Sequence, residues 1–199
     1  MRTVALLGRV PGFLVLRDAL LGNPLVSLAA VYTHGRRPRA EGGGERPELA
    51  RFIDACAAAG VPLHVLDMPE ARGLERYLPA EPFDLLLSLS WRCVLPRIVL
   101  DRPQLAAINL HRGALPDYAG AEPVRRAIEK GERRIAITAH RMVEEVDAGE
   151  ILDTTWYDID PLPPGMAAAQ YAEAVKEKLF PFYAPLARRV IAAIAGGER

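Results

Sequence analysis

The sequence predicts an α/β fold in which helices cover both faces of a mainly parallel central sheet. Two observations carry this prediction. Short apolar runs alternate with segments of helical periodicity through the first half of the chain. Half of the 199 residues are hydrophobic, which is enough to bury one sizeable core. We therefore expect a single domain that spans residues 1–199.

The first half of the chain follows a strand, helix, strand order. Apolar and β-branched runs predict strands over residues 3–8, 26–33, 61–66 and 83–89. Apolar residues at helical spacing, ended by Gly or Pro, predict helices over residues 13–21, 48–59 and 69–78. The segment 34–47 combines glycines with charged residues, and we expect a mobile surface loop there.

The second half continues the alternation. Strands are expected over residues 105–110, 135–142 and 150–159, and helices over residues 123–130 and 166–194. Pro123 suits the first turn of its helix, and Gly131 ends that helix. Pro181 and Pro185 should kink or divide the last helix, because each removes an amide donor from the helical ladder.

Charge and composition exclude several classes of function. The chain has 25 Lys and Arg residues and 25 Asp and Glu residues, so its formal net charge is zero and no basic field attracts a nucleic-acid backbone. No apolar run reaches the roughly 18 residues that span a bilayer. Cys56 and Cys93 lie far apart, without the spacing of a zinc or redox motif. We expect a cytoplasmic protein without nucleic-acid or membrane partners, and a homodimer is compatible with the sequence.

The apolar run that ends at Leu110 delivers two polar residues to the end of a strand. Strand side chains alternate, so Asn109 and His111 project from one face. Ligands of such sheets sit beyond the carboxyl ends of the strands, where a Gly- and Pro-rich loop follows here. Asp147, in a later acidic turn, can reach the same cleft if the two strand ends are neighbours. An amide, an imidazole and a carboxylate together suit acyl transfer through an anionic tetrahedral intermediate.

The order and spacing of these motifs resemble the formyltetrahydrofolate-dependent formyltransferases. The resemblance rests on Asn109-Leu110-His111, on the loop Leu115-Pro116-Asp117-Tyr118-Ala119-Gly120-Ala121-Glu122-Pro123, and on Val146-Asp147-Ala148-Gly149. It covers nearly the whole chain and is greatest for the sugar N-formyltransferases. It implies a Rossmann-like formyltransferase fold. It also implies formyl transfer from 10-formyltetrahydrofolate to the amine of a small acceptor, with an amino sugar on a nucleotide as the favoured acceptor.

The resemblance and the chemistry of the side chains together suggest roles for residues. Asn109 and His111, the latter as an imidazolium, would hold the formyl oxygen and stabilise its growing charge. Asp147 would accept the proton of the amine, directly or through a water, and raise the pKa of His111. The residues expected to bind the folate are Arg92, Cys93, Val94, Leu95, Met142, Val143 and Glu144. The residues expected to contact the acceptor are Arg9, His34 and Tyr118.

Other readings of single residues stay open. His34 is either an acceptor contact or a solvent-exposed turn residue. Trp91 either stacks on a pterin or a base, or is a buried core aromatic. His140 is set aside from the site, and its neighbour Arg141 either pairs with an acidic residue of the following turn or is solvated. The four histidines lack ligand spacing, so we expect no metal.

Three alternatives to a sugar formyltransferase remain. One is a hydrolase that releases formate from formyltetrahydrofolate, another is a phosphoribosylglycinamide-type formyltransferase, and a third is a non-catalytic folate- or nucleotide-binding module. The first loop, residues 8–12, lacks the Gly-Ser-Asn phosphate cradle, which argues against the second alternative. The chain ends soon after its last expected helix, so we expect no C-terminal tRNA-binding domain. Arg112 and Gly113 stand where many members of the family have other residues.

Overall fold

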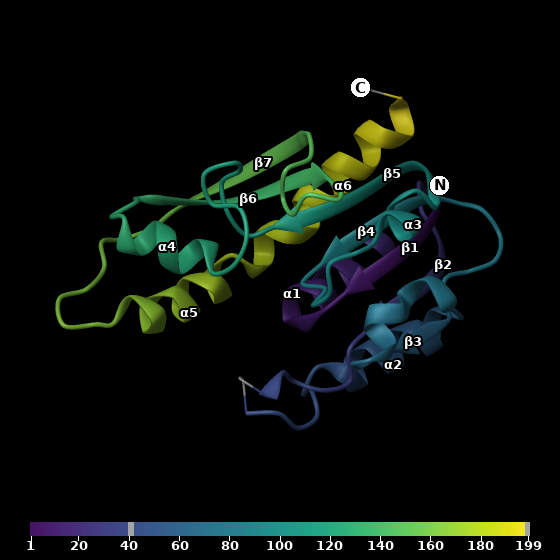
Figure 1. Cartoon of the computed structure of the whole chain (residues 1–199), viewed down its shortest axis with the longest axis horizontal. Coiled ribbons are helices and arrows are strands. Elements are labelled where there is room, and N and C mark those ends of the chain that lie inside the picture. The colour runs from purple at the N-terminus through teal and green to yellow at the C-terminus, as the bar shows by residue number, and fades with distance from the viewer. Residues whose placement is uncertain (40–41, 198–199) are drawn as a thin grey trace.

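A seven-stranded sheet forms the centre of the computed structural model, which describes residues 1–39 and 42–197 (Figure 1). The strand order is β3-β2-β1-β4-β5-β6-β7. The strands from β1 to β5 pair in parallel, whereas β6 pairs antiparallel with both β5 and β7. This arrangement confirms the predicted α/β fold with a mainly parallel sheet.

The elements lie close to their predicted positions. The strands are β1 (Arg2–Leu7), β2 (Ser27–Thr33), β3 (Leu63–Val65), β4 (Phe83–Leu89), β5 (Pro103–His111), β6 (Arg134–Arg141) and β7 (Ile151–Asp158). The α-helices are α1 (Arg9–Val15), α2 (Leu49–Ala59), α3 (Arg97–Leu100), α4 (Pro123–Glu129), α5 (Ala168–Lys178) and α6 (Phe180–Gly196). A π-helical turn, η1 (Leu16–Leu20), extends α1, and η3 (Glu70–Arg76) is a 3₁₀-helix.

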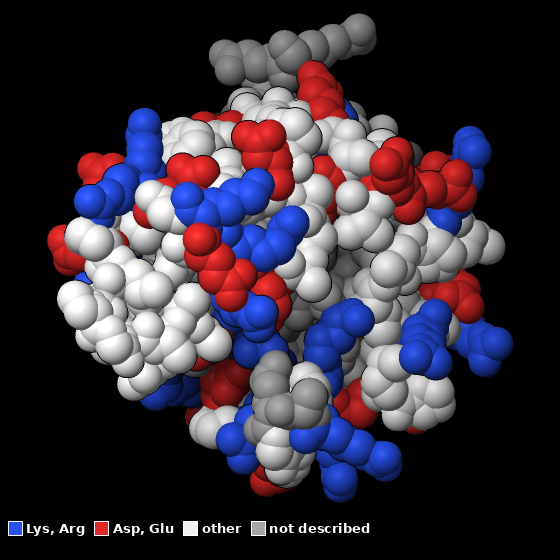
Figure 2. Space-filling model, turned by 60° about the vertical axis from the view of Figure 1, so that its left-hand side comes forward, with Lys and Arg blue, Asp and Glu red and all other residues white. Residues whose placement is uncertain are grey.

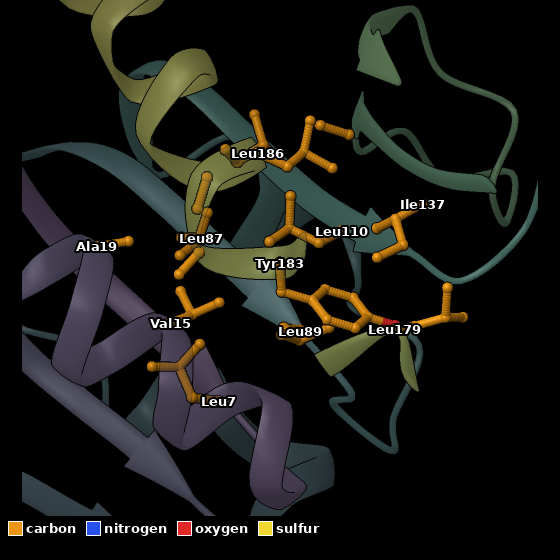
Figure 3. Packing of buried hydrophobic residues seen from close by; sticks show 14 of the residues in the cluster. Leu7, Val15, Ala19, Leu87, Leu89, Leu110, Ile137, Leu179, Tyr183 and Leu186 are labelled. Atoms are coloured by element: carbon orange, nitrogen blue, oxygen red, sulfur yellow. The ribbon is translucent and has the colours of Figure 1, made fainter. Parts of the chain in front are cut away.

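Strand alternation divides the core into two clusters, one on each face of the sheet. In β1, Ala5 and Leu7 belong to the larger cluster, whereas Leu6 belongs to the smaller one. Figure 3 shows part of the larger cluster, which includes Leu110 of β5 and Leu186 of α6. Residues of α1, α2, α4, α5 and α6 complete the larger cluster, and residues of η3 and α3 complete the smaller one. Helices therefore cover both faces, as predicted.

The structure differs from the prediction at two helices and confirms it at a third. The first helix begins at Arg9 and not at Phe13. The short helix α3 was not predicted, because four residues are too few to show a helical period. The last predicted helix is divided at Leu179, where α5 ends and α6 begins; Pro181 lies in the first turn of α6 and Pro185 lies inside it. The expected effect of prolines on this helix is therefore confirmed as a division.

The predicted surface loop 34–47 is anchored at both of its ends. Residues 40 and 41 lie outside the described part of the chain. His34 and Arg46 are buried, and Arg36 pairs with Glu45 in an isolated antiparallel bridge. The ends of this segment therefore pack against the domain and are not solvated. Within residues 1–39 and 42–197, no helix is both long enough and apolar enough to cross a membrane.

Candidate active site

A cavity of about 410 Å³ opens beyond the carboxyl ends of β4 and β5. Its walls come from the loop after β4, the end of β5, the start of α4 and the turn after β6. It contains every residue predicted to be catalytic or to bind folate: Asn109, His111, Asp147, Arg92, Cys93, Val94, Leu95, Met142, Val143 and Glu144. Three segments that are far apart in the sequence thus meet where the fold places ligands.

Strand β5 directs its polar side chains into this cavity. Ile108 and Leu110 pack into the larger core cluster, so Asn109 and His111 lie on the opposite face of the strand. Asn109 and His111 lie at the carboxyl end of β5 and line the cavity there. Alternation along one strand is therefore sufficient to place both side chains.

Three polar groups contact the Asp147 carboxylate. Its Oδ2 atom lies 3.2 Å from Nδ1 of His111 and accepts a hydrogen bond from the Gly120 backbone N–H at 2.8 Å. Its Oδ1 atom lies 3.4 Å from Nε2 of His140. The other ring nitrogen of His111, Nε2, lies 2.8 Å from the carbonyl oxygen of Tyr118. The loop before α4 therefore holds both members of the His111–Asp147 pair.

His140 is a member of the cluster that the sequence prediction left out. It pairs directly with Asn109 in the register of β5 and β6 and is 2% exposed. Its Nδ1 atom lies 2.8 Å from the Arg141 carbonyl oxygen, and its Nε2 atom lies 3.3 Å from Nδ2 of Asn109. The sequence places His140 on the strand that follows the loop. Only the register of β5 and β6 shows that His140 lies opposite Asn109. Arg141 pairs with Glu150 at 3.0 Å.

Two glycines let the loops approach these side chains. A Cβ atom at Gly149 would lie 1.9 Å from the Arg141 carbonyl oxygen, so the turn that carries Asp147 has no room for a side chain there. A Cβ atom at Gly113 would lie 2.7 Å from Pro123 Cβ and 2.9 Å from His111 Nε2. Gly113 therefore permits the close approach of the 113–123 loop to His111.

The pKa values of the central pair follow from burial and from each other. Burial lowers the pKa of His111, and although the Asp147 carboxylate and the Tyr118 carbonyl oppose this, the net direction is downward. Burial raises the pKa of Asp147, but the contacts with His140, His111 and the Gly120 N–H outweigh it, and the net direction is also downward. These directions favour a neutral His111 beside an ionised Asp147 at neutral pH. Asp147 raises the pKa of His111, as expected, but burial is the stronger influence.

The loop after β4 forms a second wall of the cavity. Trp91 is half-buried, lines the cavity and stacks on His34 with 4.2 Å between ring centroids. Arg92 pairs with Asp67 at 3.3 Å, and Cys93 lies with its Sγ atom 3.4 Å from Met68 Sδ. Trp91 is therefore not fully buried in the core, and His34 already stacks on its ring.

The residues predicted to contact the acceptor separate into two groups. Arg9, at the start of α1, lines a second cavity beside the first. His34 is fully buried behind Trp91 and lines neither cavity, so the expectations of an acceptor contact and of an exposed turn residue are both wrong. Tyr118 turns its side chain away from the reacting groups and donates its hydroxyl hydrogen to Glu132 at 2.6 Å. Only its backbone carbonyl faces His111.

No group of three or more His, Cys, Asp or Glu residues within the described ranges is arranged to hold a metal ion. The cluster is instead held together by the contacts between side chains given above, together with the Gly120 N–H and the Tyr118 carbonyl. An amide, two imidazoles and one carboxylate at these distances can stabilise a developing oxyanion and transfer a proton.

Comparisons with known structures support the fold. The glycinamide ribonucleotide transformylase 1 of Symbiobacterium toebii superposes with a TM-score of 0.71 and 20% identity, covering 99% of this chain and 88% of that one. The N-formyltransferase of Helicobacter canadensis, solved with folinic acid and dTDP-3-aminofucose, gives a TM-score of 0.65 and 16% identity, covering 100% of this chain and 65% of that one. At these identities the likeness concerns the fold alone.

Sequence comparisons identify the family. The methionyl-tRNA formyltransferase of Pseudomonas entomophila is 34% identical over 137 residues, which are 67% of this chain and 42% of that protein. The chain thus spans about two fifths of the length of the curated relatives it matches. The family model described as formyl transferase matches residues 63–178, which include the whole cluster around His111. The chain therefore belongs to the formyl transferase family.

Proposed function

We propose that this protein transfers a formyl group from 10-formyltetrahydrofolate to the amine of a small acceptor. The observation that carries the proposal is the convergence of Asn109, His111 and Asp147 in one cavity. The distance of 3.2 Å between His111 Nδ1 and Asp147 Oδ2 makes the two side chains one proton-transfer unit. Membership of the formyl transferase family supports this chemistry.

The folate would lie between the loop after β4 and the turn after β6. Leu95 and Met142 supply apolar surface there, and Val94 is 71% exposed at the same cavity. Exposed apolar side chains beside a polar site are typical of pockets that take an aromatic ligand. The backbone groups of residues 92–95 and 142–144 would then hold the pterin edge.

Formyl transfer requires a nucleophilic amine and a stabilised oxyanion. As the amine attacks the formyl carbon, the C–O double bond becomes a single bond and its oxygen gains negative charge, which an Asn109 N–H would stabilise. The intermediate then collapses, the bond to N10 of the folate breaks, and N10 takes up a proton. His111 and Asp147 provide the route for that proton from the amine.

The two side chains would take different parts in the proton transfer. Both pKa values are lowered, but the ordinary pKa of a histidine is well above that of an aspartate, so we assign acceptance of the amine proton to neutral His111. Once charged, both of its ring nitrogens donate, and Asp147 and the Tyr118 carbonyl oxygen are in place to accept. The proposal thus moves the base from Asp147 to His111, with Asp147 as its stabilising partner.

An amino sugar carried on a nucleotide is our preferred acceptor. The sequence resemblance to sugar N-formyltransferases supports it, and so does the presence of a second cavity beside the first. The folate would be the co-substrate, and the reaction as written needs no metal. Both cysteines are free thiols, which fits the reducing conditions of a cytoplasmic enzyme.

Methionyl-tRNA is a second candidate acceptor, favoured by the 34% identity to a methionyl-tRNA formyltransferase. Two observations weigh against it. The formal net charge of the chain is zero. Figure 2 shows Lys and Arg side chains interspersed with Asp and Glu across the visible face, without one continuous basic surface.

A parallel assay separates the candidates. The purified protein is incubated with 10-formyltetrahydrofolate and, in separate reactions, with dTDP-linked amino sugars, glycinamide ribonucleotide, methionyl-tRNA or no acceptor. Mass spectrometry of the acceptor and release of tetrahydrofolate are the readouts. Formylated amino sugar supports the preferred proposal, whereas formylated tRNA or ribonucleotide replaces it. Formate release without any amine would indicate a hydrolase.

A matched pair of variants tests the site itself. His111→Ala should abolish formyl transfer, because the proton acceptor is lost. His64→Ala removes a histidine of β3 that stacks on Tyr32 with 4.7 Å between ring centroids, outside the cavity, and should keep turnover. Full activity in His111→Ala would overturn the assignment of the base.

A further inference from the structure

A second cavity of about 470 Å³ adjoins the proposed active site. It lies where the start of α1, the end of β5, the start of α4 and helix α5 meet. Arg112 and Lys176 line both cavities, so a ligand can extend from one into the other. The charged residues in its wall are Arg9, Arg92, Arg112, Lys176, Glu122 and Glu173. Basic side chains outnumber acidic ones there.

Protein carboxylates already engage two of these basic side chains. Lys176 bonds to Glu173 at 2.7 Å and to Glu122 at 3.3 Å. The guanidinium of Arg92 pairs with Asp67 at 3.3 Å. Lys176 therefore holds both acidic residues of the wall.

Arg112 differs from these residues. It is half-buried, and among the described residues no ion pair involves it. It follows His111 in the chain and lies on the opposite side of the strand end, near the fully buried Tyr183 of α6. Burying a guanidinium without a carboxylate costs free energy unless another anion compensates it.

We propose that Arg112 is a specificity-determining residue that binds an oxyanion of the acceptor, a phosphoryl or carboxylate group, in this second cavity. The inference rests on the proposed function, because the amine of the same acceptor must reach His111. A guanidinium binds both kinds of oxyanion through two parallel N–H···O bonds, which fixes orientation as well as position. The anion would thus anchor the acceptor from the side of β5 opposite the reacting amine.

The arrangement also connects the anion to the reacting histidine. The charge of Arg112 contributes to the lowered pKa of His111. An anion bound at Arg112 neutralises that charge and raises the pKa of His111, which makes His111 a stronger base when the acceptor is in place. A residue that serves only to support the fold would not give this response.

Binding of simple anions tests the proposal without folate or turnover. Inorganic pyrophosphate and malonate are titrated by calorimetry into the full chain at constant ionic strength. Wild type is compared with Arg112→Gln, Arg112→Lys and the control Arg125→Gln, an exposed residue of α4 that pairs with Glu129 at 2.8 Å. Thermal unfolding of each variant establishes that it is folded.

We expect Arg112→Gln to weaken anion binding by about tenfold or more, Arg112→Lys by less, and Arg125→Gln by less than about twofold. Preference for pyrophosphate or for malonate identifies the oxyanion. We also expect pyrophosphate to raise the pKa of His111 in an NMR titration of wild type but not of Arg112→Gln. Equal binding by wild type and Arg112→Gln, or no binding by wild type, overturns the proposal; if Arg112→Gln is unfolded, Arg112→Lys decides.

The two proposals fail in different ways. If anions bind through Arg112 but no amine is formylated, the anion site stands and the formyltransferase proposal falls. If an acceptor is formylated and Arg112→Gln leaves its KM unchanged, the formyltransferase proposal stands and the anion site falls. A raised KM for the acceptor, with an unchanged KM for the folate, supports both.

Discussion

Two buried histidines of this protein occupy contrasting surroundings. His34 is fully buried, contacts the Leu66 carbonyl oxygen through Nδ1 at 2.7 Å, and stacks on Trp91. His111 is almost as buried, but it contacts a carboxylate, Asp147, and borders a cavity. Burial lowers the pKa of both rings, to about 4 for His34. At His111 the Asp147 carboxylate opposes part of this lowering. A carboxylate and access to a ligand therefore separate a reactive histidine from a packing one.

Removing the carboxylate should have the largest effect. In Asp147→Asn we expect kcat to fall by about a thousandfold, because a general base loses its stabilising partner. The pKa of His111 should fall further below its ordinary value, since the charge that opposes the effect of burial is gone. Steady-state kinetics and an NMR titration measure the two effects.

Asp117→Asn is the control for this change, because Asp117 is exposed on the same loop that contacts His111. It should keep wild-type turnover and the wild-type titration of His111. If Asp147→Asn retained turnover, the carboxylate would not be what distinguishes the reactive His111 from the buried His34.

His34 should dominate a different property, the dependence of stability on pH. Its pKa is about 4 in the folded protein and about 6.5 in the unfolded chain. Between these values the unfolded state binds more protons, so the free energy of unfolding falls as the pH decreases, by up to about 3 kcal/mol. In His34→Gln we expect this slope to flatten, as measured by urea unfolding between pH 4 and pH 6.5. An unchanged slope would show that His34 is not protonated on unfolding.

The turn that supplies the carboxylate provides the next test. Gly149→Ala should lower the free energy of unfolding by about 1–3 kcal/mol, because its Cβ atom overlaps the Arg141 carbonyl oxygen and the turn must move. Turnover should fall with it, since Asp147 moves with the turn. Gly73→Ala is the matched control: its Cβ would meet only Arg76 and Glu75 side-chain atoms at 3.8 Å, and the change should stay within about 0.5 kcal/mol.

If Gly149→Ala left both stability and turnover unchanged, the close approach of the turn to β6 would not position Asp147. Denaturant unfolding and steady-state kinetics on the same preparations decide the matter. Loss of stability without loss of turnover would limit the role of Gly149 to the fold.

Local patterns were sufficient for much of the fold and for half of the cluster. Strand alternation placed Asn109 and His111 on one face, because the period of two is a property of a single strand. The resemblance to a family added Asp147 from its turn. The short helix α3 was missed, because its four residues show no period.

Contacts between distant segments were beyond the reach of sequence patterns. His140 joins the site only because β6 pairs with β5 in a register that sets it opposite Asn109. His34 was expected at the surface, yet the loop after β4 brings Trp91 over it. In both cases the deciding partner is far away in the sequence, and neither a period nor a composition reports on it.

The smallest expected effect concerns His140, a positioning residue. Its Nε2 atom lies 3.3 Å from Nδ2 of Asn109 and 3.4 Å from Oδ1 of Asp147, so one atom orients both the amide and the carboxylate. His140→Phe keeps a ring of similar shape but removes both contacts. We expect kcat to fall by about tenfold, with less than a twofold change in the KM of the folate, because substrate binding does not depend on these contacts.

His140→Gln distinguishes orientation from simple packing. A glutamine offers an acceptor oxygen to Asn109 and a donor to Asp147, so it should recover part of the kcat that His140→Phe loses. The pH profile of kcat should also shift in His140→Phe, because the hydrogen bond from His140 helps to hold the pKa of Asp147 down. A raised KM with an unchanged kcat would instead make His140 a wall of the folate pocket. The positions of Asn109 and Asp147 would then not depend on His140.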